Sequence, residues 1–262
     1  MAILPYFESF FRITTIQSLL ELSNLNHPLM KRLLLNAPGT YQHSLMVANL
    51  AEAAANEIRA NNVLCRVSSY FHDIGKLNRP IFFIENQFSQ ENPHKKLTPQ
   101  MSKNIIISHT TDGLELAKKY QLPTILQDII VQHHGTSCLS VFYHKAVSHS
   151  EEINRDQFRY PGPKPQTKES GIVMLADCVE AATKALEKPS YEELEQLINR
   201  LFKEKIDDGQ LVDCPLSFNE ISKIKQAFLT IYKGIHHHRN DYEKEIKSIV
   251  DASEKPEDKD AS

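Results

Sequence analysis

The chain has 262 residues, of which 41% are hydrophobic and 24% are charged, as is ordinary for a globular protein. Its formal net charge of −3 excludes an overall basic field that would draw the chain to nucleic acid or anionic lipid. Four scattered cysteines argue against a disulfide framework, and no apolar run reaches the roughly 18 residues that span a bilayer.

An apolar segment over residues 6–24 is dense enough for a helix that is buried on much of its surface, or for one that emerges from a membrane. Pro28 fits the first turn of a short second helix, which extends through Leu35. The Ala-Pro-Gly sequence at residues 37–39 then breaks that helix. Because glycines are few and strand-like alternation is scarce, the rest of the chain also favours helices.

Histidines occur at the ends, or at a comparable depth, of the next predicted helices. These helices span about residues 40–60 and 62–73, and two more begin near Thr98 and Pro123. We expect Gly75 to stop the second of them, directly after a His-Asp pair. The histidines are His43, His72, His109 and the pair His133-His134.

A polar, proline-rich segment follows from about Ser148 to Ser170. Flexible linkers rarely contain a sequence such as FRYPGPKPQ, so this segment predicts a structured lid or a wall of an active site. The next predicted helix contains Asp177 within an otherwise apolar stretch. A buried carboxylate requires a partner, and a metal ion is a good one.

Two capping boxes, Ser190 with Glu193 and Ser217 with Glu220, mark the starts of the last helices. The sequence therefore predicts an all-α helical bundle with a proline-rich insertion loop and C-terminal capping helices. The expected divisions are an N-terminal juxtamembrane helix over residues 1–25, the main domain over residues 26–250 and a disordered tail over residues 251–262.

Seven side chains are candidate metal ligands, because a helical bundle brings side chains from facing helices into one pocket. Imidazoles and carboxylates without a thiolate suit iron, manganese, cobalt or zinc, and do not suit calcium. Seven ligands are too many for one ion with an open position, but they fit two ions that share Asp73 and hold a bridging hydroxide for attack on phosphorus. The candidates are His43, His72, Asp73, His109, His133, His134 and Asp177.

The order of these residues, H…HD…H…HH…D, resembles the two-metal branch of the HD-domain metal-dependent phosphohydrolases. Over roughly residues 5–245, the sequence is also similar to the cytoplasmic HD domain of the seven-transmembrane HD family, the PgpH-type cyclic-di-AMP phosphodiesterases. The segments that carry this similarity include HDIGK at 72–76, FFIENQ at 82–87, HHGT at 133–136 and FRYPGPKPQTKE at 158–169.

The resemblance implies a phosphodiesterase domain over residues 26–250 that hydrolyses cyclic di-AMP to linear pApA. It also implies that this chain is the soluble C-terminal part of a bacterial membrane protein, at the cytoplasmic face and attached through missing N-terminal transmembrane segments. The related cyclic-di-GMP phosphodiesterases carry Gly-Tyr-Pro soon after the paired histidines. This chain has Gly135-Thr136-Ser137 at that point, which weakens the cyclic-di-GMP alternative.

The catalytic candidates are Asp73 and Lys76. Lys76 lies one helical turn past His72, so we expect it to contact a non-bridging phosphate oxygen. The native metal remains open, because iron and manganese fit about equally well. We expect one ion to be held by His43, His72, Asp73 and Asp177, and the second by Asp73, His109, His133 and His134.

A basic rim for a substrate with two phosphates is predicted from Arg79, Lys95, Lys96, Lys164 and Lys168. Among the aromatic residues that would stack on adenine, Tyr160 is the candidate substrate contact. The other aromatic candidates are Tyr41, Tyr70 and Phe83, and core packing explains most of them. The histidine triple at 236–238 is expected to be exposed and to have no role.

Several alternatives stay open on the sequence. The first alternative is a phosphohydrolase of the same scaffold that acts on cyclic di-GMP or another nucleotide. The second is a nucleotide monophosphatase or a di-iron oxygenase on that scaffold. A sensor module that binds nucleotide without turnover is the alternative that is not an enzyme. No DNA or RNA polymer is expected as a partner, and a homodimer is compatible with the sequence.

Overall fold

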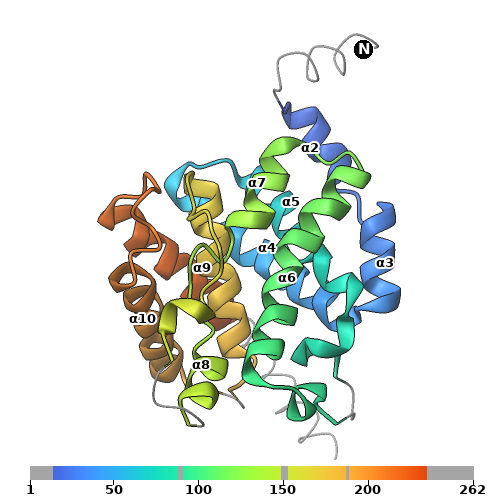
Figure 1. The fold of residues 1–262 in the computed structure, drawn as a ribbon. Coiled ribbons are helices and arrows are strands. Elements are labelled where there is room, and N and C mark those ends of the chain that lie inside the picture. Colours follow the sequence, from blue (N-terminus) through green and yellow to red (C-terminus); the bar gives the residue numbers. More distant parts are fainter. Residues whose placement is uncertain (1–13, 88–90, 149–152, 187–188, 235–262) are drawn as a thin grey trace, which may run out of the picture.

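A computed structural model describes residues 14–87, 91–148, 153–186 and 189–234 of the chain. Within these ranges the fold is all-α, which confirms the fold class predicted from the sequence (Figure 1). The described residues form no β-strand, only an isolated antiparallel bridge between Cys138 and Arg159.

The α-helices account for most of the described chain. They are α2 (Ile16–Leu22), α3 (Pro28–Asn36), α4 (Pro38–Ile58), α5 (Asn62–Phe71), α6 (Pro99–Lys119), α7 (Thr124–Gln132), α8 (Ser140–Val147), α9 (Lys168–Thr183) and α10 (Tyr191–Asp207), followed by a helix over residues 218–234. Short 3-10 helices are η1 (Ile74–Asn78), η2 (Pro80–Phe82), η3 (Ile84–Asn86), η4 (Pro93–Lys96) and η5 (Arg155–Phe158).

Sequence signals set many of the helix starts. Proline occupies the first turn of α3, α4 and α6, where its missing N–H costs no helical hydrogen bond. Both predicted capping boxes are confirmed: Ser190 and Glu193 cap α10 reciprocally, and Ser217 and Glu220 do the same for the helix over residues 218–234. Helix α8 was not predicted, and no side chain caps its start.

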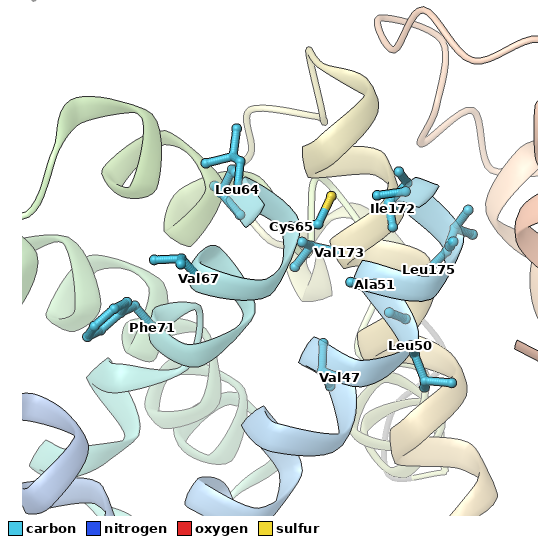
Figure 2. Packing of buried hydrophobic residues seen from close by; sticks show 14 of the residues in the cluster. Val47, Leu50, Ala51, Leu64, Cys65, Val67, Phe71, Ile172, Val173 and Leu175 are labelled. Carbon is cyan, nitrogen blue, oxygen red and sulfur yellow. The ribbon is translucent and has the colours of Figure 1, made fainter. Parts of the chain in front are cut away.

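Helix α4 packs mainly against α5 and α9, and this contact forms much of the core. Figure 2 shows side chains of all three helices meeting in one apolar cluster. Small residues such as Ala51 and Ala54 are fully buried on α4, which lets the neighbouring helices approach closely. The core therefore fixes the start of α4, the end of α5 and the middle of α9 relative to one another.

The segment after α5 differs from the prediction. Helix α5 ends at Phe71 and is capped by His72, so Gly75 does not stop it but lies inside η1. A Cβ atom on Gly75 would lie 1.9 Å from the backbone carbonyl oxygen of His109. The glycine is required because η1 packs directly against the backbone of α6.

Some expectations fall outside the described residues. They concern most of the juxtamembrane segment, the tail over residues 251–262 and the histidine triple at 236–238; the division of the chain into three regions stays a prediction. In the described part of the chain, no helix is long and apolar enough to cross a membrane.

Candidate metal centre

The structure brings all seven predicted ligands together from five helices. His43 lies near the start of α4, Asp177 lies in α9, and His109 lies in the middle of α6; the two adjacent pairs follow α5 and α7 directly. All are buried except His134, whose side chain is 21% exposed. The ligand atoms fall into two sets, each within 4.8 Å of one another: His43, His72, Asp73 and Asp177, and Asp73, His109, His133 and His134.

Asp73 belongs to both sets because its two oxygens face in different directions. Its Oδ2 lies 3.4 Å from His43 Nε2 and 3.3 Å from His72 Nε2. Its Oδ1 lies 3.3 Å from His109 Nε2 and 3.7 Å from His133 Nε2. This is the geometry that a carboxylate bridge between two ions requires.

Asp177 also reaches both sets. Its Oδ1 lies 3.0 Å from His43 Nε2, and its Oδ2 lies 3.5 Å from His134 Nδ1. The position of this carboxylate follows from α9, whose buried side faces the start of α4.

Hydrogen bonds determine which ring nitrogens are free to bind a metal. The Nδ1 atoms of His72, His109 and His133 lie 2.7, 2.6 and 2.7 Å from a backbone carbonyl oxygen three residues earlier. A carbonyl only accepts, so Nδ1 carries the proton and Nε2 of the neutral ring carries a lone pair. The Nε2 atoms of His109 and His133 face each other at 3.2 Å. A cation between them would remove the repulsion between their two lone pairs.

The Asp73 carboxylate gives a second test of whether a metal fits. Asp73 is only 1% exposed, and neither of its oxygens makes a hydrogen bond of good geometry, although Lys76 Nζ lies 2.7 Å from Oδ2. A buried carboxylate requires compensation of its charge, and the surrounding imidazole nitrogens are ligands that divalent transition metals prefer. The residues of this centre therefore fit such ions.

The charges of the first set favour a cation. Burial opposes protonation of His72, but the carboxylates of Asp73 and Asp177 outweigh it and raise the pKa of His72 to about 9. Burial likewise opposes protonation of His43, yet its hydrogen bonds to Asp177, Asp73 and Glu180 hold its pKa well above the usual value. Positive charge, from protons or from a metal ion, is thus stabilised at this set.

The second set has the opposite balance. Burial is the main influence on His109, and it lowers the pKa of this residue to about 4 against the attraction of Asp73. Burial also holds the pKa of His134 well below its usual value. These two rings are neutral near pH 7, which is the form that binds metal.

Lys76 reaches the centre and lies between two carboxylates. Its Nζ is 2.7 Å from Asp73 Oδ2 and 2.8 Å from Glu85 Oε1, and it lies 5.0 Å from the centroid of the Phe83 ring. Glu85 also accepts a hydrogen bond of 3.1 Å from Thr40 Oγ1. Sequence reasoning quoted the FFIENQ segment that contains Glu85 but gave Glu85 no role, because its charge alone does not distinguish it from a solvated glutamate.

Glu180 is a second residue that sequence reasoning missed. It lies one helical turn after Asp177, is 3% exposed and forms a hydrogen bond with His43 Nδ1. The signal was present in the sequence, since α9 carries two carboxylates one turn apart in an apolar stretch.

The proline-rich segment forms a wall beside the second set. The Tyr160 ring lies with its centroid 4.3 Å from that of His134 and 5.9 Å from that of His109. Arg159 ties the segment to the end of α10 through bonds of 2.9 and 3.0 Å to the Asp208 carboxylate. Phe83 is buried against His109 on another side, with 5.8 Å between centroids.

The candidate basic rim is less closely associated with the centre. Arg79 is exposed and donates a hydrogen bond of 2.5 Å to Ser108 Oγ on α6. Lys168 pairs with Glu220, and Lys164 Nζ lies near Gly209. Among the described residues, no hydrogen bond or ion pair joins these three cations to the seven ligands, and their role as substrate contacts stays a prediction.

The remaining candidates lie further away. Lys95 is exposed, and Lys96 pairs at 3.3 Å with Glu91. Tyr41 and Tyr70 pack against the apolar core, which agrees with the expectation that most of these aromatic residues serve core packing.

The family of this chain follows from its sequence and fold together. The family model for the HD domain matches residues 40–182, and the chain belongs to the HD-domain family. Within that family it is similar to PgpH proteins, which confirms the resemblance that the motifs indicated.

The similarity extends over almost all of this chain. "Cyclic-di-AMP phosphodiesterase PgpH" of Bacillus subtilis (strain 168) is 49% identical over 249 residues, which are 95% of this chain and 35% of that protein. The chain also covers 34% of the PgpH of Listeria monocytogenes, so it spans about a third of the length of these curated relatives.

Two crystal structures of the PgpH HD domain from L. monocytogenes share this fold. Each is 46% identical to this chain and covers 81% of it. The first has a TM-score of 0.77 with all of that domain covered; the second, in complex with cyclic di-AMP, has a TM-score of 0.79 with 99% covered.

Proposed function

We propose that this chain is a metal-dependent phosphodiesterase that hydrolyses cyclic di-AMP to linear pApA. The observation that carries the proposal is the pair of ligand sets that share Asp73. Further support comes from the similar HD domain whose crystal structure contains cyclic di-AMP.

Two divalent ions, iron or manganese, would be held by the two sets. When bound, such ions neutralise phosphate oxygens and lower the pKa of a water molecule so that it becomes a nucleophile at neutral pH. The assignment of His43, His72 and Asp177 to one ion, and of His109, His133 and His134 to the other, is supported by the two directions of the Asp73 oxygens.

Lys76 supplies a fixed positive charge beside this site. Burial opposes that charge, but Asp73 and Glu85 outweigh it and hold the pKa of Lys76 above its usual value. The ammonium group therefore remains protonated, and we assign it to a non-bridging phosphate oxygen of the substrate.

Tyr160 limits the space above His134. The residue is only 6% exposed and its ring lies against His134, and we assign to it the exclusion of water from this side of the site and the positioning of the substrate against the second set. The proline-rich segment is thus a wall of the active site in this proposal.

We also propose that the chain works as part of a longer protein, attached through N-terminal transmembrane segments at the cytoplasmic face of the membrane. The greater length of the curated relatives supports this proposal. A homodimer stays a prediction from the sequence.

Anaerobic purification with metal analysis, followed by incubation with cyclic di-AMP, cyclic di-GMP and AMP, tests the proposed reaction. We expect two ions per chain and pApA as the product, with cyclic di-AMP cleaved fastest. Tight binding of intact cyclic di-AMP would instead identify a sensor module. Release of inorganic phosphate from AMP would identify a monophosphatase.

A further inference from the structure

Four histidines of the centre have a ring nitrogen, Nδ1, that faces away from the ligand sets, and they differ in the group that Nδ1 contacts. His72, His109 and His133 each direct Nδ1 at a backbone carbonyl oxygen of their own helix. His43 directs Nδ1 at a side-chain carboxylate from another helix, the Oε2 atom of Glu180. One of the two ligand sets thus contains an imidazole with a charged partner.

The contact with His43 Nδ1 explains why Glu180 is buried. Its side chain is 3% exposed, and its other oxygen lies 2.9 Å from Lys184 Nζ. Lys184 is 44% exposed and needs no buried partner, so the ion pair alone does not account for placing a carboxylate in this apolar stretch. Other contacts anchor α9 to the helix over residues 218–234, among them a hydrogen bond of 2.7 Å between Thr183 and Tyr232 and an ion pair between Lys168 and Glu220.

Two carboxylates of α9 contact the two ring nitrogens of His43. Asp177 and Glu180 lie one turn apart, with Asp177 Oδ1 3.0 Å from His43 Nε2 and Glu180 at Nδ1. A carboxylate at Nδ1 keeps the proton on that atom, leaves Nε2 unprotonated for a metal, and makes Nε2 more basic than a carbonyl partner does.

We propose that Glu180 is a positioning residue that fixes the orientation of His43 and makes the set of His43, His72, Asp73 and Asp177 the tighter of the two ion sites. The inference rests on the proposed two-metal function. It goes further, because it predicts that the two ions leave the protein in a definite order.

Metal titration of the Glu180→Gln variant tests this order. Gln has the same shape and still accepts a hydrogen bond, but it lacks the charge. We expect the dissociation constant of the tighter of the two Mn²⁺ ions to rise 10- to 100-fold while that of the other stays unchanged. Unchanged affinity for both ions, or equal weakening of both, would overturn the inference.

A double-mutant cycle separates positioning from a general effect on the fold. His43→Ala removes the ligand through which Glu180 acts, so Glu180→Gln should have no further effect on Mn²⁺ affinity in that background. Thr183→Val is the matched control, since it alters a half-buried contact of α9 close to Glu180 without touching His43. We expect it to bind both ions normally.

The wild-type protein gives an independent test that does not depend on the folding of a variant. In ¹⁵N-labelled protein loaded with Cd²⁺, the Nδ1 atom of His43 should carry a proton and Nε2 should couple to the metal. The reverse assignment would overturn the inference. The proposed function fails separately, when the wild-type protein binds fewer than two ions or leaves cyclic di-AMP intact.

Discussion

Asp73 is the residue on which both ligand sets depend, because each set contains one of its oxygens. Asp73→Asn keeps the size of the side chain and removes its charge, so we expect neither set to retain its ion. Turnover should fall by about 1000-fold or more, at the upper end of the effects seen when a key electrostatic group is removed. Metal analysis and a cyclic di-AMP assay of the same sample check this.

Asp128 offers a control for this change. It is an exposed aspartate on α7, the helix that leads to His133, and it lies outside both ligand sets. Asp128→Asn should keep both ions and normal turnover. Normal metal content in Asp73→Asn would contradict the role of Asp73 as a bridge.

Lys76 is expected to act on the substrate rather than on the metals. Lys76→Met keeps much of the side-chain volume but removes the charge between Asp73 and Glu85. We expect kcat to fall about 100-fold, as when one preorganised donor is removed, while both ions are retained. Steady-state kinetics with parallel metal analysis measure this; an unchanged kcat would exclude the proposed phosphate contact.

The sequence was sufficient to select the seven candidate ligands that the structure brings together, since each is a histidine or aspartate beside or within an apolar helical stretch. It did not show the partners of Glu85 and Glu180, whose burial depends on residues elsewhere in the chain, even though the position of Glu180 one turn after Asp177 in an apolar stretch was a signal. Lys76 and Thr40 hold Glu85, and His43 holds Glu180. Glutamates in a sequence are usually solvated, and only the packing of the helices shows which ones are not.

At the scale of the helices, the sequence predicted starts better than ends. Proline and capping residues mark starts locally, and they were correct for α3, α6 and α10. The end of α5 was misjudged because Gly75 was read as a helix stop. Its actual constraint is the backbone of α6, which is distant in sequence and leaves no local signal.

Gly75→Ala should therefore destabilise the protein through the contact between η1 and α6. Its Cβ would lie 1.9 Å from one backbone oxygen, the carbonyl of His109, and backbone cannot move aside as a side chain can. We expect a loss of about 2 kcal/mol in the free energy of unfolding, as is typical of overpacking. Urea unfolding followed by circular dichroism measures it.

Gly234 provides the matched control for this glycine. It is the last described residue of the helix over residues 218–234, and nothing is found within 4 Å of the position of an added Cβ. Gly234→Ala should be neutral or slightly stabilising, because alanine favours the helix. Equal stability of the two variants would show that the packing of η1 against α6 is not tight.

At the scale of the whole molecule, the C-terminal helices are tied to the bundle that carries the candidate metal centre. One connection is an ion pair between Lys168, at the start of α9, and Glu220, in the first turn of the helix over residues 218–234. Hydrogen bonds from Lys168 and Ser217 lower the pKa of Glu220 to about 2. Its contribution to stability is therefore complete above the usual glutamate pKa of 4.5 and is lost as the pH falls toward 2.

Glu220→Gln tests this connection, because glutamine preserves the capping box with Ser217 and removes only the charge. At pH 7 we expect the variant to lose up to about 1 kcal/mol in the free energy of unfolding, a small value because solvent screens the pair. Near pH 2 both proteins should unfold with similar free energies, since wild-type Glu220 is then about half protonated in the folded protein and most of the contribution of its charge is lost. Glu193→Gln makes the same change in the capping box of α10, away from Lys168, and should not reproduce this pH dependence. Urea titrations of the three proteins at both pH values decide the point, and a difference that persists at pH 2 would show that the charge of Glu220 is not its cause.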